Sequence, residues 1–285
     1  MKRDFCIGSE WLYFKIYTGV KTADLILLEK INPVILELTE KNLILKWFFI
    51  RYKDTDEHFR LRFLLSKPNS LAQVINKIYP VLNALLEENS VWKIQTDTYQ
   101  REIERYGEKN IEDSETLFWH DSEMILQYLV LKLNFKKNET QLLFSFLAID
   151  QFLNSFSLSN SDKLFLMNDL QSSFKKEFDV DKMLKKKMDK HYRALSQKIQ
   201  YLLSGTALND YPEINKVIQE KQNRDNQTIL SIKAKLQIPQ FNFLMSHIHM
   251  TINRQYTSKQ RIYESLIYDH LYRHYKMIEN KPSDI

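Results

Sequence analysis

The chain has 285 residues, of which 44% are hydrophobic and 13% aromatic, and this composition is typical of a globular protein with a sizeable core. Its formal net charge of +5 permits an acidic ligand but does not require nucleic acid. The four glycines and the single Cys6 disfavour glycine-rich phosphate loops, an internal disulfide and CxxC metal sites. We find neither a bilayer-spanning apolar run nor a signal-like N-terminus, and therefore expect a soluble, cytoplasmic protein with no membrane role.

The first hundred residues alternate strand-like and helix-like patterns. Period-two alternation of apolar side chains predicts four strands, at residues 10–18, 43–52, 58–65 and 91–99. Between them, Thr22 is placed to cap a helix that Pro33 is expected to bend or split, and Ser70 with Gln73 forms a capping box for a second helix. The order βαββαβ predicts a ferredoxin-like α/β unit with an antiparallel sheet, over residues 1–110.

Beyond this unit the pattern is almost entirely helical. One helix begins near residue 112, and further amphipathic stretches lie at 139–156, 161–176, 180–203, 211–237, 240–255 and 257–279. We expect residues 111–285 to form a helical portion that covers the open face of the sheet, so that the chain is one compact catalytic domain of the α+β class.

The third predicted strand carries the most informative pattern. It places Phe59 and Leu61 on one face and aligns His58, Arg60 and Arg62 on the other. Neighbouring cations on one face repel each other, and a carboxylate ligand gripped by the guanidinium groups would offset that repulsion. The alternative is a solvated face whose charges pair with acidic side chains of adjacent strands.

The neighbour of this strand is also predicted. A ferredoxin-like unit usually orders its strands 4-1-3-2, so the first and third strands pair. Tyr13, Lys15 and Tyr17 of the first strand would then lie beside the cations of the third. Such an aromatic face is unsuited to water, which is why we expect the helical portion to cover it.

Three blocks of the sequence are distinctive: RYxDxxxHxRxR from Arg51, ExERYG from Glu102 and HMxxNR from His249. With residues 11–17, 47–50 and 115–122, they resemble the C-terminal elimination domain of class I lanthipeptide dehydratases. The stand-alone form of that domain is known as the thiopeptide-type bacteriocin biosynthesis protein. The resemblance spans almost the whole chain, although Glu108 stands where the family usually has the second glycine of ERYGG.

The resemblance implies an enzyme, a lyase acting on a peptide. In the family, a separate glutamylation protein uses glutamyl-tRNA to esterify serine or threonine side chains of a precursor peptide. The elimination domain then removes glutamate and leaves dehydroalanine or dehydrobutyrine. The residues implied for elimination are Arg60, Arg62, Arg105 and His249. The expected partners are the glutamylated precursor peptide and the separate glutamylation subunit, with no direct nucleic-acid contact, no cofactor and no metal.

The chemistry suggests a role for each residue type. β-Elimination needs the α-proton removed and the departing carboxylate neutralised. We expect the arginines to hold the glutamate and His249 to transfer the proton, with Lys15 or a neighbouring tyrosine as the alternative base if burial lowers its pKa. The candidate substrate-binding residues are Tyr13, Lys15, Tyr17, Arg51, His58 and Arg254. The alternative role for Arg51 and Arg254 is structural pairing with acidic side chains. The alternative role for His58 is to orient the strand or the neighbouring arginines.

Two other functions remain open at this point. Some stand-alone members of the family join two dehydroamino acids by a formal [4+2] cycloaddition, which builds the pyridine of thiopeptides and releases the leader peptide. A non-enzymatic scaffold, whose basic face docks a precursor peptide, is the second alternative.

Overall fold

The computed structural model describes residues 1–135, 139–177, 182–205 and 210–280. The chain divides into two compact units. The first comprises Met1–Val130, Leu230–Ile238 and Asn253–Ser258, and the second contains the remaining described residues. The first unit therefore extends beyond the boundary predicted at residue 110, because the helix α5 (Ile111–Lys132) belongs largely to it.

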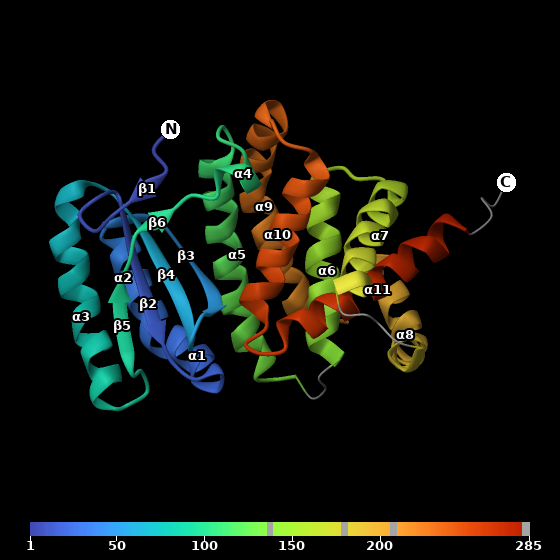
Figure 1. The fold of residues 1–285 in the computed structure, drawn as a ribbon, viewed down its shortest axis with the longest axis horizontal. Coiled ribbons are helices and arrows are strands. Elements are labelled where there is room, and N and C mark those ends of the chain that lie inside the picture. The colour runs from blue at the N-terminus through green and yellow to red at the C-terminus, as the bar shows by residue number, and fades with distance from the viewer. Residues whose placement is uncertain (136–138, 178–181, 206–209, 281–285) are drawn as a thin grey trace. The chain divides into compact units, whose positions relative to one another are not determined.

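The first unit mixes helices with antiparallel sheets (Figure 1). Its strands are β1 (Asp4–Phe5), β2 (Trp11–Tyr17), β3 (Ile44–Lys53), β4 (Glu57–Leu65), β5 (Lys93–Thr96) and β6 (Tyr99–Gln100). Its other helical elements are α1 (Val20–Leu25), the π-helix η1 (Ile26–Ile31), α2 (Asn32–Glu40), the 3-10 helix η2 (Pro68–Ser70), α3 (Leu71–Glu87) and α4 (Ile103–Tyr106). The main sheet has the strand order β3-β4-β2-β5, and β1 pairs with β6.

The main sheet has one strongly apolar face. Phe59, Leu61 and Phe63 of β4 are buried on it, together with Phe49 of β3. Helices α2 and α3 each bury an apolar stripe, which supplies the other half of this core. The expected pairing of the first and third predicted strands is confirmed, since β2 and β4 are neighbours. The predicted fourth strand is divided into β5 and β6, and β6 pairs with β1, which the sequence pattern did not predict.

The helix expected to bend or split at Pro33 is interrupted as predicted. It runs through α1, the π-helix η1 and α2, and Pro33 occupies the start of α2. Proline lacks an N–H and is tolerated at the start of a helix. Immediately before it, the hydrogen-bonding pattern of η1 changes from that of an α-helix to that of a π-helix. The predicted caps are wrong: Gly19 precedes α1 instead of Thr22, and the Ser70 hydroxyl contacts the Ser66 hydroxyl without capping α3.

The outer edge of β3 is bonded to side chains (Figure 1 shows α5 beside this strand). The Ser122 hydroxyl of α5 accepts a hydrogen bond from the Phe49 N–H at 3.2 Å. The Asn253 side chain accepts from the Arg51 N–H at 2.9 Å and donates to the Arg51 carbonyl at 2.8 Å. The Arg254 Nε donates to the Phe49 carbonyl at 2.8 Å. These bonds satisfy backbone groups that a strand edge otherwise leaves unpaired.

The second unit is helical. It contains α6 (Glu139–Ser155), α7 (Asn160–Glu177), α8 (Lys182–Leu203), α11 (Gln260–Glu279) and most of α9 (Pro212–Lys235) and α10 (Gln240–Gln255). Each of the six amphipathic stretches predicted beyond residue 138 coincides with one of these helices to within three residues at either end, and only residues 180–181 of the stretch at 180–203 lie outside the described residues. Helix α11 packs against α6, α7 and α8.

Candidate functional site

The predicted cations of β4 share one face of the main sheet. In the pairing with β2, Tyr13 lies opposite Arg62, Lys15 opposite Arg60 and Tyr17 opposite His58. We call these six residues the basic face. Side chains alternate between the two faces of the sheet along each strand. Because the two strands pair in the register given above, these six side chains project from the same face.

Arg62 is a buried cation surrounded by aromatic rings. Its side chain is 7% exposed, and its guanidinium carbon lies 4.4 Å from the Tyr13 ring centre, 5.2 Å from that of Phe48 and 4.8 Å from that of Tyr99. Its Nε has no hydrogen-bond partner, and no carboxylate pairs with it in the part of the chain that the structure describes. Burial lowers the pKa of Arg62. A buried cation without a counter-ion is costly, so this position attracts a carboxylate ligand.

Arg60 is held by stacking and by His58. Its guanidinium carbon lies 3.5 Å from the centre of the Tyr52 ring, and its Nε donates to His58 Nε2 at 3.3 Å. His58 Nδ1 lies 3.1 Å from the carbonyl oxygen of Asp56, which can only accept, so Nδ1 is the protonated nitrogen. Burial lowers the pKa of His58 from its ordinary 6.5. Neutral His58 therefore orients Arg60, in agreement with the second of the two roles predicted for it.

This arrangement predicts a pH dependence of stability. Since the pKa of His58 is lower in the folded than in the unfolded chain, the contribution of neutral His58 is fully present above pH 6.5 and is lost as the pH falls through the folded value. We expect the melting temperature of the wild type to fall faster than that of His58→Phe when the pH is lowered below 6.5. Parallel curves for the two proteins would contradict the assignment.

Lys15 and Tyr13 do not have the lowered pKa that a base would need. The Lys15 ammonium lies 2.5 Å from an oxygen of Asp97, and this bond raises the pKa of Lys15. Burial raises the pKa of Tyr13. Both groups are therefore protonated at neutral pH, which disfavours them as the alternative base and leaves Lys15 as a third cation of the basic face.

Arg105 lies in the same unit, on the short helix α4. Its side chain is 47% exposed and pairs with Glu102 at 3.2 Å. The charge of Glu102, the residue before α4, also acts on Arg62. Helix α4 ends at Gly107, whose φ of +80° favours glycine, while Glu108 does not adopt a positive φ. The presence of Glu108 in place of the second glycine of the motif is therefore compatible with the turn after Arg105.

Arg51 and Arg254 are paired within the chain. Arg51 donates to Asp24 at 2.6 Å and to the Arg254 carbonyl at 2.8 Å. Arg254, only 1% exposed, donates to Asp121 at 2.9 Å as well as to the edge of β3. These contacts favour the structural alternative for both residues, and their role in substrate binding stays a prediction.

His249 belongs to the second unit and lies on α10. Its Nδ1 is 2.5 Å from an oxygen of Glu264 on α11. The sequence pattern did not single out Glu264. It lies fifteen residues after His249, on the next helix, and two residues on different helices share no periodic pattern. Asp97, the partner of Lys15, was missed for the same reason, since cross-element partners leave no pattern in one sequence.

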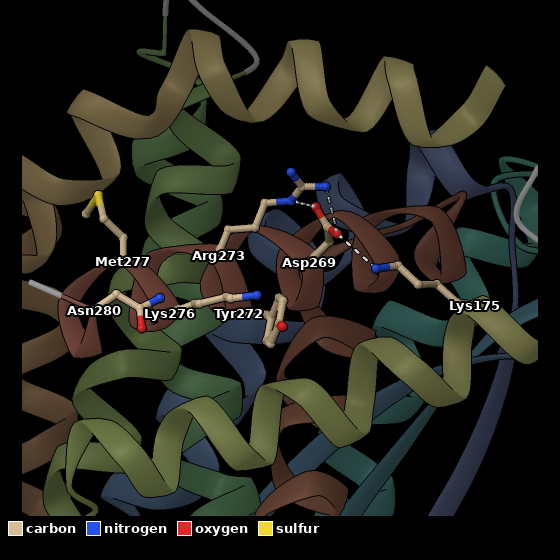
Figure 2. Close-up of a pocket in the computed structure, with 7 residues that line it drawn as sticks. All are labelled: Lys175, Asp269, Tyr272, Arg273, Lys276, Met277 and Asn280. Atoms are coloured by element: carbon tan, nitrogen blue, oxygen red, sulfur yellow. Dashed lines mark hydrogen bonds and ion pairs between the residues drawn. The ribbon is translucent and has the colours of Figure 1, made fainter. Parts of the chain in front are cut away.

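The second unit contains a cavity of about 360 Å³ (Figure 2). It is lined by Lys175, Asp269, Tyr272, Arg273, Lys276, Met277 and Asn280. Figure 2 shows Arg273 and Lys175 both directed at the Asp269 carboxylate, and Arg273 also pairs with Asp189. Two of its three cations are thus already neutralised, and none of the predicted site residues lines it. This cavity is a weaker candidate for a carboxylate ligand than the basic face.

The described ranges contain neither a metal-binding cluster nor a membrane-spanning helix. No group of three or more histidine, cysteine or acidic residues is placed there to hold a metal ion. Among the same residues, no helix combines the length and the apolar character needed to cross a membrane.

The chain is thus an α+β protein with arginines on one face of its main sheet. The chain belongs to the family described as the lantibiotic biosynthesis dehydratase C-terminal domain, whose model matches residues 11–275. This confirms the family resemblance found in the sequence. The subtilin biosynthesis protein SpaB of Bacillus subtilis is 28% identical over 61% of this chain, and the nisin biosynthesis protein NisB of Lactococcus lactis subsp. lactis is 26% identical over 73%. The chain spans only 17% and 22% of the lengths of these two relatives.

Solved structures share the fold. The tRNA-dependent lantibiotic dehydratase MibB from Microbispora sp. 107891 superposes with a TM-score of 0.78 at 20% identity, covering 98% of this chain and 29% of its own. The pyridine synthase TbtD from thiomuracin biosynthesis gives a TM-score of 0.66 at 13% identity, covering 94% of this chain and 100% of its own. The same fold therefore occurs in proteins described by two different activities.

Proposed function

We propose that this chain removes glutamate from glutamylated serine or threonine residues of a ribosomal precursor peptide, and leaves dehydroalanine or dehydrobutyrine. The observation that carries the proposal is the basic face, where Arg60 and Arg62 lie side by side and Arg62 has no carboxylate partner among the described residues. A leaving glutamate brings two carboxylates, and each can accept two parallel hydrogen bonds from a guanidinium group.

The reaction sets the tasks of the site. A base removes the α-proton of the modified residue, and the electron pair forms the Cα=Cβ double bond. The Cβ–O bond of the ester breaks, and its electron pair leaves with the glutamate carboxylate. In the proposed assignment, Arg60, Arg62 and Arg105 bind the glutamate and stabilise the negative charge that develops as it departs. Lys15, a protonated neighbour of Arg60, adds to this positive potential.

His249 is the proposed proton acceptor. Imidazole is the side chain whose ordinary pKa suits proton transfer near neutral pH. The resemblance of the HMxxNR block supports this assignment, as does the hydrogen bond of Nδ1 with Glu264, which leaves Nε2 as the nitrogen for the reaction. The raised pKa values of Lys15 and Tyr13 speak against these two groups as the base.

The finer assignments belong to the same proposal. A separate glutamylation protein would supply the glutamylated precursor, so the chain would act as one subunit of a split dehydratase, in the cytoplasm. The strand order β3-β4-β2-β5 and the crossings through α2 and α3 support a ferredoxin-like unit at the N-terminal half. Tyr13 and Tyr17 would contact the substrate from β2.

Reconstitution tests this function. The chain is combined with a purified glutamylated precursor peptide, and peptide masses are followed with time. We expect the wild type to release glutamate and leave one dehydrated residue for each adduct. Arg60→Ala should leave glutamyl adducts in place, with a rate about 10²-fold lower. Arg193→Ala, which removes an exposed arginine of α8, is the matched control and should react like the wild type.

The two alternatives give different masses. A pyridine synthase would leave glutamyl adducts untouched and would convert a peptide that already carries two dehydroamino acids, with release of its leader; the fold shared with TbtD is compatible with this activity. A scaffold without activity would bind the peptide and change no mass. Either result with the glutamylated peptide would overturn the proposal.

A further inference from the structure

The carboxylate of Glu264 is buried against the imidazole of His249. Glu264 is 0% exposed, and its Oε1 lies 2.5 Å from His249 Nδ1. The imidazole itself is about one-third exposed, and the described residues provide no hydrogen-bond partner for its Nε2. One nitrogen of the ring is therefore bound to the protein core, and the other is available.

Glu264 is itself held in place. Arg261 Nη1 donates to its other oxygen, Oε2, at 2.6 Å, and the amide of Gln260 donates to Oε1 at 3.4 Å. All three residues lie in the first turns of α11, where the helix dipole favours a negative charge. Arg261 also stacks on Phe174 at 4.0 Å and pairs with Glu177. Arg261 therefore gives the buried carboxylate a counter-ion.

The carboxylate of Glu264, paired with Arg261, determines the tautomer of His249. A carboxylate only accepts hydrogen bonds, so Nδ1 must carry a hydrogen and donate it. In the neutral ring, Nε2 is then the unprotonated nitrogen with a free electron pair. A buried carboxylate in this position also fixes the plane of the ring and stabilises the imidazolium that forms on proton uptake, as the acid of a catalytic triad does.

We propose that Glu264 is a positioning residue for elimination: it fixes His249 with Nε2 unprotonated and without a hydrogen-bond partner among the described residues, ready to accept the α-proton. This inference rests on the proposed function, since it concerns the reaction assigned to His249. Arg261 and Gln260 support the carboxylate and do not touch His249.

Glu264→Gln is the informative substitution. If its amide oxygen accepts from Arg261, its NH₂ group faces Nδ1 and forces the opposite tautomer, with the hydrogen on Nε2. We expect the rate of glutamate release to fall by about 10²- to 10⁴-fold, the upper value being that found when the orienting acid of a catalytic triad becomes an amide. Glu264→Asp retains the charge and should restore part of this loss.

Two readouts separate positioning from a structural role. Nitrogen NMR of labelled histidine, in mildly alkaline buffer, should find the hydrogen on Nδ1 in the wild type and on Nε2 in Glu264→Gln. In addition, the double variant His249→Ala with Glu264→Gln should be no slower than His249→Ala alone, because Glu264 acts only through the ring. Glu177→Gln, which removes the other acid of Arg261, is the matched control and should keep wild-type activity.

The outcomes distinguish this inference from the proposed function. If His249→Ala eliminates glutamate at the wild-type rate, the function assigned to His249 fails. If His249→Ala stalls but Glu264→Gln keeps the tautomer and the rate of the wild type, only the inference on Glu264 fails. Additive losses in the double variant would likewise overturn it. Should Glu264→Gln fail to fold, Glu264→Asp provides the test through its elimination rate and the tautomer of its His249. If Glu264→Asp eliminates at the wild-type rate with the hydrogen on Nε2, the inference on Glu264 is overturned.

Discussion

Arg62→Met is expected to stop elimination without lowering the melting temperature. The substitution removes the guanidinium group and retains an unbranched apolar side chain among Tyr13, Phe48 and Tyr99. Loss of one preorganised donor to a developing carboxylate lowers kcat by about 10²- to 10³-fold. Stability should stay the same or rise, because the wild type buries a cation without a carboxylate partner among the described residues.

Arg101 provides the matched control for this prediction. It is also a buried arginine of the first unit, but its guanidinium donates twice to Glu115, at 2.7 Å for both bonds. Arg101→Met leaves Glu115, which is 1% exposed, without this cation, so its melting temperature should fall. Free glutamate should raise the melting temperature of wild type and Arg101→Met, but not that of Arg62→Met. A destabilised Arg62→Met that eliminates normally per folded molecule would assign Arg62 a structural role.

The second large effect is expected from Arg254→Leu. This change leaves the buried Asp121 without its cation and the Phe49 carbonyl without its donor. Removing one partner of a buried ion pair costs about 3–5 kcal/mol, which corresponds to a fall in melting temperature of roughly 6–20 °C. Thermal unfolding followed by circular dichroism measures this directly. The double variant Arg254→Leu with Asp121→Leu should lose less than the sum of the two single changes.

Kinetics decide whether Arg254 has the substrate-binding role predicted from the sequence. If Arg254 is structural, the folded fraction of Arg254→Leu keeps the KM of the wild type for the glutamylated peptide. A KM raised more than about tenfold, with the fold intact, would mean that the residue contributes about 1.4 kcal/mol or more to substrate binding. An unchanged melting temperature would contradict the structural assignment.

The strands and long helices were predictable because their residues alternate or repeat with the period of the element. One topological expectation placed Tyr13, Lys15 and Tyr17 beside the cations of the neighbouring strand, and the register of β2 with β4 confirms it. The pairing of the two-residue strands β1 and β6 was not predictable, since two residues such as Asp4 and Phe5 are too few to show an alternating pattern. The predicted cap at Ser70 failed because its hydroxyl contacts another side chain, the hydroxyl of Ser66 four residues earlier.

Partners of the candidate site were the hardest part to predict. Nothing in the sequence pattern connected Lys15, Arg254 and His249 with the acids that pair with them, because each acid lies on a different segment of the chain. Asp121 is more than a hundred residues from Arg254, and only the folded chain brings the two together. The arginines were found through alternation and family motifs. Only the structure showed that Arg254 pairs with an acid, whereas Arg62 has no carboxylate partner among the described residues.

The side chains bonded to β3 have a consequence for association. An exposed edge is a template on which another chain can add as a strand, and from there aggregation can spread. Here the groups of Phe49 and Arg51 that would recruit such a strand are already bonded to Ser122, Asn253 and Arg254. The opposite edge, β5, has only four residues and begins with Lys93, two features that discourage the same process. A peptide substrate of the proposed reaction therefore finds these groups of Phe49 and Arg51 already bonded and cannot add to them as a strand.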